Sequence, residues 1–399
     1  MTDSRIIGLM GASHLTSHFL QLALPPLFPL IKAEFGASYI ELGLIVSVFY
    51  AASGIGQTVS GFLVDRLGAR PVLLTGMGLL AGGVVLFGLS PTYWTMLPIA
   101  LLAGLGNSVF HPADYSILSA SVTRGRLARG YSLHGFGGNI GYMLAPVVVG
   151  PLGLHLGWRA ALLVAGGLGL AGAAAVASGT RALARRTDLG GHASAGPLLS
   201  DVRLLLATPI LVAFTYFALI AAAFIGVQTF GVTAMVAIYQ APIALATGAL
   251  TAFFLGNATG LLIGGLLADR TMRHDVLAVT GMLAASGLML VMAAAVLPYT
   301  LLPAVLALAG FALGVTSPSR DMLVRSATPS GASGKVFGFV YSGLDLGSLV
   351  APLVYGWLLD RGEPRAVFVT AAVIMAVTIV TVVQVRRRAQ PVAAPATGA

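Results

Sequence analysis

Charged residues are scarce in this chain of 399 residues, and cysteine is absent. Lys, Arg, Asp and Glu together make up 9% of the residues, whereas a soluble domain contains about 25%. Hydrophobic residues make up 57%. The lack of cysteine excludes disulfides and thiolate metal sites. The scarcity of charge excludes a water-soluble domain and, despite the net charge of +9, a nucleic-acid-binding patch. An integral membrane protein without a nucleic-acid partner is predicted.

Two further features are missing from the sequence. The first 35 residues contain no short apolar core followed by a small-residue cleavage site, so we expect them to form the first span rather than a removed signal. An ATP-binding motif is also absent. If the chain moves a solute, the energy is therefore expected to come from an ion gradient or from exchange.

Long apolar runs are abundant. A spanning helix requires about 20 mostly apolar residues, and the runs are continuous rather than alternating, which favours helices over a barrel. An all-α integral membrane fold with twelve spanning helices is predicted. The spans lie near 5–30, 41–64, 71–90, 93–120, 128–152, 157–178, 207–235, 243–268, 275–297, 299–325, 333–358 and 364–385.

Positive charge is distributed unevenly between the predicted loops. Most of the 22 Lys and Arg residues fall in alternate loops and at the termini, and only Lys32, Arg159, Arg361 and Arg365 fall in the others. By the positive-inside rule, both termini are expected in the cytoplasm. The net charge thus reports topology rather than a charged ligand.

The chain is predicted to contain two pseudo-symmetric six-helix halves. The segment 61–76 resembles 264–281, and the segment 129–146 resembles 335–352. The only long polar loop joins the sixth and seventh spans. The expected organisation is a first half at 1–178, a cytoplasmic linker at 179–206, a second half at 207–388 and a disordered tail at 389–399.

The loop after the second span carries a recognisable motif. Gly61, Asp65, Arg66, Gly68 and Arg70 follow the pattern G-x-L-x-D-R-x-G-x-R, which resembles the signature loop of the major facilitator superfamily. A degraded copy follows the eighth span, at Gly265, Asp269, Arg270 and Arg273. The resemblance implies that Asp65, Arg66, Arg70, Asp269 and Arg270 form a gate that closes the cytoplasmic face.

A finer resemblance concerns three segments. LPPLFPLIKAEFG, GNSVFHPADYS and SPSRDMLVRSATPSGASGKVFGF are similar to the fosmidomycin-resistance branch of bacterial exporters. That branch implies proton-driven antiport, efflux and drug resistance, and fosmidomycin itself is a small phosphonate.

Two histidines lie deep in the first span. His14 and His18 are about 14 Å and 20 Å beyond Arg5 along a helix, near the middle of a bilayer core about 30 Å thick. Their spacing of four residues places both on one face. Packing histidines bonded to carbonyls are the alternative, but a substrate or proton site is favoured because two imidazoles on one face at the midplane are hard to satisfy by packing alone. Imidazole also titrates near neutral pH.

His111 and Asp114 lie three residues apart in the fourth span, beside Pro112. They share a helix face, and the proline removes a backbone donor and loosens the helix. An internal ion pair that braces the helix end is the alternative to a functional site here.

The second half offers its own candidates. Asp321 is four residues from Arg325 and is expected either to pair with it or to carry protons, whereas Arg320 points elsewhere and can meet an anion. Asp345 is the one acidic residue predicted at mid-membrane, either as a proton carrier or as a carboxyl bonded between helices. The predicted substrate-binding residues are His14, His18, His111, His134, Arg320, Asn139, Gln57 and Tyr50. The predicted proton-coupling residues are Asp114, Asp321 and Asp345.

These observations predict a secondary transporter of a small, anionic organic solute or drug, working by proton-coupled alternating access in the direction of export. It is expected to be a monomer without cofactor or bound metal, surrounded by lipid in the bacterial inner membrane. Proton-coupled uptake, transport of a metal ion and a membrane-embedded metal-dependent hydrolase are the alternatives. The hydrolase would use His14, His18, His111 and Asp114, but the sequence contains no H-E-x-x-H motif.

Overall fold

Helices account for the regular structure of the described chain. The computed structural model describes residues 2–181, 204–268, 270–271, 273–326 and 333–388. The first half contains α1 (Asp3–Gln21), η1 (Pro25–Leu27), α2 (Phe28–Phe35), α3 (Tyr39–Leu67), α4 (Ala69–Gly88), α5 (Tyr93–Asn107), α6 (Phe110–Ser121), α7 (Arg124–Leu156) and α8 (Trp158–Gly179). The second contains α10 (Thr208–Tyr239), α11 (Ile243–Ala268), α12 (His274–Ala294), η3 (Tyr299–Leu301), α13 (Leu302–Ser326), α14 (Ser333–Asp360) and α15 (Pro364–Arg388).

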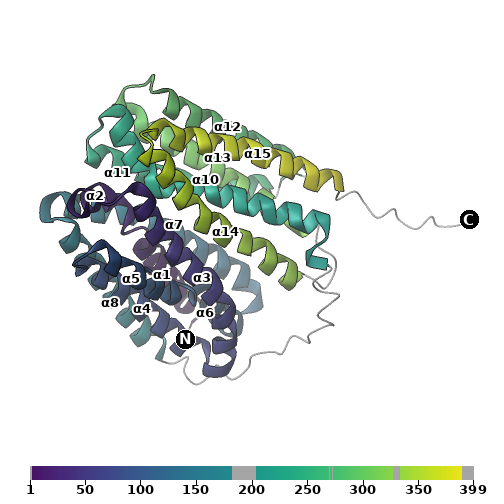
Figure 1. Ribbon diagram of the computed structural model, residues 1–399. Coiled ribbons are helices and arrows are strands. Elements are labelled where there is room, and N and C mark those ends of the chain that lie inside the picture. Colours follow the sequence, from purple (N-terminus) through teal and green to yellow (C-terminus); the bar gives the residue numbers. More distant parts are fainter. Residues whose placement is uncertain (1, 182–203, 269, 272, 327–332, 389–399) are drawn as a thin grey trace, which may run out of the picture.

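The helices form two bundles that lie side by side (Figure 1). Helices α1 to α8, drawn from purple to blue, form one bundle, and α10 to α15, drawn from teal to yellow, form the other. Most of the predicted linker and the whole predicted tail lie outside the described residues. The predicted twelve-span helical fold is confirmed.

Eleven of the described helical segments are long and apolar enough to span a membrane, with Tyr93–Ser121 counting as one. Helix α1 is the twelfth span, and its composition is more polar. Ser13, His14 and Ser17 on this helix are buried inside the first bundle rather than exposed to lipid. A spanning helix can carry such residues where neighbouring helices cover them.

Prolines change two of the predicted spans. The first span was expected to reach residue 30, but α1 ends at Gln21 because Pro25 and Pro26 cannot continue its hydrogen bonding, and α2 starts afresh at Phe28. The fourth span is divided into α5 and α6. The break lies one turn before Pro112, whose missing N–H leaves the preceding turn without a bond, so the predicted loosening is confirmed.

The turns between consecutive spans show why the helices begin where they do. Helix α3 starts with a capping box in which Ser38 and Glu41 satisfy each other's backbone N–H groups. Gly68 and Gly157 have φ angles of 86° and 84°. Each is the single residue between two helices, Gly68 between α3 and α4 and Gly157 between α7 and α8. A side chain at either position would be strained.

Arginine side chains define one face of the molecule, which we call the basic face. Arg66, Arg126, Arg181 and Arg270 are exposed there, at the ends of α3 and α8, at the start of α7 and after α11. The opposite face carries α2 and the ends of α7 and α14.

The two bundles pack against each other at the opposite face, along a line of contacts between α3 and α14 that we call the outer seam. The backbone N–H groups of Tyr39 and Ile40 donate to the Asp360 carboxylate at 2.7 and 2.8 Å. The Ser47 hydroxyl donates to the Leu349 carbonyl at 2.7 Å. Asp360 thereby caps the first turn of a helix that belongs to the other bundle.

Candidate functional site

A cavity of about 730 Å³ lies between the two bundles, which is within the range of about 300–1,000 Å³ typical of small-molecule sites. Its lining extends from Tyr50 and Ser348, next to the outer seam, to Tyr115 and Arg320, nearer the basic face. Helices α1, α3, α5, α6 and α7 form one wall, and α10, α11, α13 and α14 form the other.

The wall formed by the first bundle is polar. Every residue that it contributes to the lining carries a hydrogen-bonding group. These residues are His18, Gln21, Tyr50, Ser53, Gln57, Asn107, His111, Tyr115 and Tyr142.

Hydrogen bonds connect this wall across four helices. The Tyr142 hydroxyl donates to Gln21 at 2.8 Å, the Gln21 amide donates to Asn107 at 2.7 Å, and the Asn107 amide donates to Ser53 at 2.9 Å. Ser17 also donates to Asn107, at 3.0 Å. Because each group is already oriented by a partner, the wall is preorganised for a polar ligand.

Four imidazoles gather beside this wall. The His14 ring stacks on the His134 ring with centroids 3.9 Å apart, and it lies 4.2 Å from His18 and 5.3 Å from His111. The predicted grouping of His14 with His18 is thus present in the structure, and the two are joined by His111 from α6 and His134 from α7. His18 and His111 line the cavity, whereas His14 and His134 are buried behind them.

Asp114 is fully buried at the end of this group. His134 Nε2 lies 3.0 Å from its carboxylate, and the Ser13 hydroxyl donates to the other oxygen at 3.3 Å. The partner expected from the sequence spacing was His111, which instead turns toward the cavity, so the ion-pair interpretation of His111 and Asp114 is wrong. The pairing depends on how α6 packs on α7, which residue spacing along one helix does not determine.

Further contacts order the buried pair. The His14 Nδ1–H donates to the His134 carbonyl oxygen at 2.9 Å. Gly138, one turn after His134, leaves room for two rings, because a Cβ there would lie 2.7 Å from His18 Nδ1 and 2.9 Å from His14 Cε1. Within the described residues, His14 Nε2, His18 Nδ1 and His134 Nδ1 are buried without a hydrogen-bond partner. They are positions at which a proton or a water molecule can be held.

The wall formed by the second bundle is mixed. Asp345 from α14 lines the cavity, and its carboxyl group lies against Gly54 of α3, where a Cβ would be 3.4 Å from Asp345 Cγ. Among the described residues Asp345 has no hydrogen-bond or ion-pair partner, so the alternative of a carboxyl bonded between helices is not observed. Arg320 lines the cavity nearer the basic face, with its guanidinium 4.5 Å from the Phe217 ring centre.

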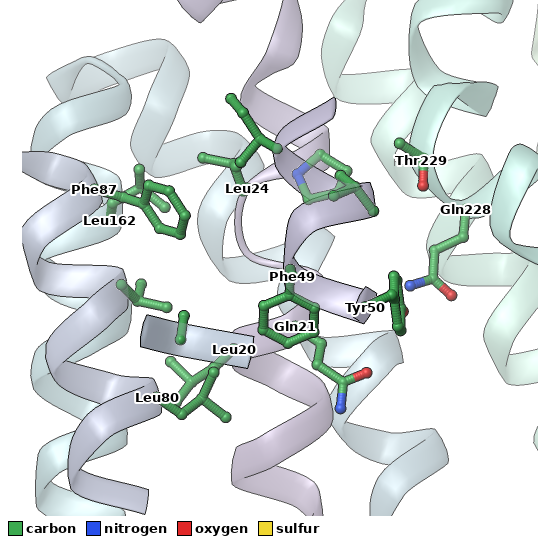
Figure 2. A pocket seen from close by; sticks show the side chains of 15 residues that line it. Leu20, Gln21, Leu24, Phe49, Tyr50, Leu80, Phe87, Leu162, Gln228 and Thr229 are labelled. Atoms are coloured by element: carbon green, nitrogen blue, oxygen red, sulfur yellow. The ribbon is translucent and has the colours of Figure 1, made fainter. Parts of the chain in front are cut away.

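The cavity ends in a nearly filled region toward the opposite face (Figure 2). Only about 30 Å³ of space remains there, roughly one water molecule. Gln21, Tyr50 and Gln228 gather on one side of this space, and Leu20, Leu80 and Phe87 lie on the other. Gln21 and Tyr50 line both this space and the main cavity, so among the described residues the space between the halves narrows at these two side chains.

Hydrogen bonds also connect α2 to α8 within the first bundle at the opposite face. Glu34 of α2 accepts hydrogen bonds from Trp158 and Arg159 at the start of α8. These hydrogen bonds hold the pKa of the Glu34 carboxyl below its usual value. The carboxylate form of Glu34, and with it this contact, is present at neutral pH.

The structure describes the side chains of three of the five residues predicted to form the gate, Arg66, Arg70 and Arg270. The Arg66 side chain is exposed, whereas Arg70 donates to Thr180 Oγ1 at 3.1 Å and to the Ala177 carbonyl at 3.0 Å, and so caps the end of α8. Arg270 is exposed at the basic face. The side chains of Asp65, Asp269 and Asp321 lie outside the described residues.

Two further predicted residues have different surroundings. Gln57 lines the cavity, whereas Asn139 donates to the Gly135 carbonyl of its own helix at 3.2 Å and does not line it. Gln21 and Tyr142 were missed by sequence reasoning. Gln21 follows His14 and His18 at helical spacing, so the polar stripe on α1 was the pattern that could have revealed it.

Within the described chain, no group of three or more His, Asp or Glu side chains is arranged to hold a metal ion. The imidazoles pack face to face or edge to face against one another, and His134 alone among them contacts Asp114, rather than all pointing their nitrogens at one centre.

Comparison with known proteins identifies the family to which this sequence is similar. The family model of the Major Facilitator Superfamily matches residues 10–250 and 229–399. The chain is 32% identical over 156 residues to the fosmidomycin resistance protein of Escherichia coli, covering 38% of each chain. It is 32% identical over 140 residues to the membrane sensor protein UhpC of Escherichia coli, covering 35% of this chain and 31% of the relative. The matched segments thus span about a third of these curated relatives.

A solved structure is similar over nearly the whole chain. A mutant of the nucleoside transporter NupG superposes with a TM-score of 0.78 at 15% identity, covering 96% of this chain and 99% of that one. At this identity the similarity concerns the fold. The matching family model covers both halves, and the fold is that of twelve spans around a central cavity. The chain belongs to the major facilitator superfamily, which consists of multi-pass membrane transporters rather than enzymes.

Proposed function

We propose that this protein is a proton-coupled transporter that exports a small organic anion from the cytoplasm. One observation carries the proposal: a ligand-sized cavity between the two bundles has His18 and His111 on one wall and the carboxyl group of Asp345 on the other. The similarity to a fosmidomycin resistance protein supports export and drug resistance. We further propose a monomer in the bacterial inner membrane, surrounded by lipid.

We assign the basic face, and with it both termini, to the cytoplasm, and the distribution of Lys and Arg supports this orientation. The cavity then faces inward, and the outer seam closes the path to the outside. Residues 1–178 and 207–388 act as the two rocking halves, with 179–206 as the linker and 389–399 as a disordered tail.

Substrate recognition is assigned to the positive and polar groups of the cavity. Protonated His18 and His111, together with Arg320, attract the anion, and Tyr50 and Gln57 supply neutral hydrogen bonds. His14 and His134 hold the exposed imidazoles in place from behind through ring stacking. Asn139 lies on α7, one turn before the lining residue Tyr142, and its role in recognition is indirect because it does not line the cavity.

Proton coupling is assigned to carboxylates at two depths. Asp345 exchanges protons with the cavity directly. Asp114 reaches the cavity only through His134, His14 and the exposed imidazoles, so it acts as a buried proton reserve. Asp321, at the end of α13 nearer the basic face, is assigned a proton-coupling role as well. Asp65, Arg66, Arg70, Asp269 and Arg270 form the cytoplasmic gate when the halves rock together, as the family resemblance implies.

Transport in liposomes tests this function. Purified protein in vesicles loaded with methylphosphonate should expel it when the vesicle interior is more alkaline than the outside, and proton flux should run opposite to the solute. Proton flux in the same direction as the solute would identify the uptake alternative. Transport of lipophilic cations in preference to anions would refute the anion assignment.

Topology gives an independent prediction, made simple by the absence of native cysteine. A cysteine at Thr92, which is exposed at the opposite face, should react with an impermeant maleimide in intact cells. A cysteine at Ser194 in the predicted linker should react only after the membrane is opened. The reverse pattern would overturn the orientation.

The histidines predict the pH dependence of binding. His18→Gln and His111→Gln should each weaken binding of methylphosphonate and flatten its dependence on pH, because an imidazole attracts an anion only when it is protonated. Affinity is measured on purified protein by calorimetry across the pH series. His155→Gln, at the far end of α7 and outside the cavity, is the control and should retain the wild-type profile. An unchanged profile in both cavity variants would exclude the two imidazoles as the anion site.

A further inference from the structure

The two walls of the cavity differ in chemistry, and the difference points to the shape of the solute. We infer that the substrate is a two-sided organic anion, with its charged group held between the polar wall of the first bundle and Arg320, and an alkyl or aryl group on an apolar wall of the second bundle. The apolar wall consists of Ile220, Phe224, Ile225, Leu313 and Leu344. The inference rests on the proposed function and adds the second part of the ligand.

Helix α10 supplies the centre of the apolar wall. Its lining residues are Ile220, Ala221, Phe224 and Ile225, which recur at helical spacing and form one face. Leu313 from α13 and Leu344 from α14 extend this face on neighbouring helices. The polar lining residues of the second bundle lie on α11, α13 and α14, so they flank the α10 face rather than interrupt it.

The apolar wall is preformed. The Phe224 ring packs against the rings of Phe253 and Phe254, with centroids 5.4 and 5.8 Å apart. Phe253 and Phe254 are themselves fully buried. A ligand therefore meets a fixed surface and orders little protein on binding.

The size of the cavity agrees with such a ligand. About 730 Å³ is far more than a phosphate or a two-carbon acid fills. Water against the apolar wall is unfavourable, and an apolar group that replaces it gains affinity in proportion to the area covered. A wholly polar solute would leave this wall hydrated, whereas a two-sided anion satisfies both walls and bridges the two halves.

A homologous series of n-alkylphosphonates from methyl to hexyl tests the inference. Affinity for the purified full-length protein should rise by about fourfold per added methylene until the wall is covered. The neutral n-alkyl ureas of the same lengths should bind weakly, because they lack the charge recognised by the polar wall. An affinity that does not change with chain length in the wild-type protein would overturn the inference.

Matched leucine variants localise the effect. Leu344→Ala should reduce the gain in affinity per added methylene across the phosphonate series. Leu308→Ala, the same change at an exposed position of α13 outside the cavity, should leave the whole series unchanged. If both variants behave alike, the apolar group does not lie on this wall.

The two proposals fail in different ways. If no phosphonate binds at any length and the ureas do, the anion assignment of the proposed function is wrong, and the apolar wall is tested by the urea series alone. If methylphosphonate binds and longer chains bind no better, the anion assignment stands and the two-sided substrate is wrong.

Discussion

Asp345→Asn is expected to abolish uphill transport of the anion while exchange of internal for external substrate continues. The asparagine retains the shape of the carboxyl group but cannot take up or release a proton. Exchange requires only that the loaded carrier rock between its two states. Uphill transport also requires the empty carrier to return with a proton, and the variant lacks the cavity group assigned to it.

The size of the effect follows from the driving force. A pH difference of one unit is worth about 1.4 kcal/mol per proton, which supports roughly tenfold accumulation of a solute coupled to one proton. The variant should show no accumulation above equilibrium in the same vesicles. The measurement compares solute accumulation under a pH gradient with the rate of counterflow of labelled substrate.

Two variants control for local damage. Asp345→Glu keeps a titratable group and should retain part of the accumulation. Ser348→Ala removes a polar lining group one turn away on α14 without removing a carboxylate, and it should remain coupled. If Asp345→Asn accumulates solute as the wild type does, the coupled proton binds elsewhere, and Asp114 becomes the first candidate.

Hydropathy and charge were sufficient to predict the fold. Continuous apolar runs identify spans because lipid offers no hydrogen bonds to the backbone, and a helix satisfies all of its backbone N–H and C=O groups internally. The errors came from prolines, which end α1 at Gln21 and divide the fourth span. Their influence was recognised at Pro112 but not at Pro25 and Pro26. The residues around Pro25 and Pro26 are all apolar, so hydropathy alone does not show that the helix ends there.

The site could be predicted only in part. Polar residues in an apolar span are costly, so His14, His18, His111 and Asp345 stood out from composition alone. Their partners did not, because the pairing of Asp114 with His134 depends on the packing of α6 against α7. The apolar wall was invisible in the sequence for a similar reason: isoleucine and phenylalanine facing a cavity cannot be distinguished from those facing lipid.

Gly43→Ala is expected to prevent closure of the outer seam and to inhibit transport strongly. A Cβ at this position of α3 would overlap the carbonyl oxygen and carbon of Pro352 in α14. The obstacle is backbone, so the two halves must separate rather than repack a side chain. Overpacking of this kind costs about 1–3 kcal/mol, enough to shift the ratio of closed to open seam by roughly fivefold to 150-fold.

Spin labels across the opposite face measure this shift. Ala33 and Glu363 are exposed, one on each half, and can be replaced by cysteine for labelling. No native cysteine competes for the label. The distance distribution between them should move to longer values in Gly43→Ala. Gly61→Ala, on the same helix with open space around the added Cβ, should show the wild-type distribution and near-normal transport. Equal distributions in the two variants would show that the seam tolerates the methyl group. Closure of the outside would then have to depend on other contacts between the halves, with the Asp360 carboxylate at the start of α3 as the next contact to break.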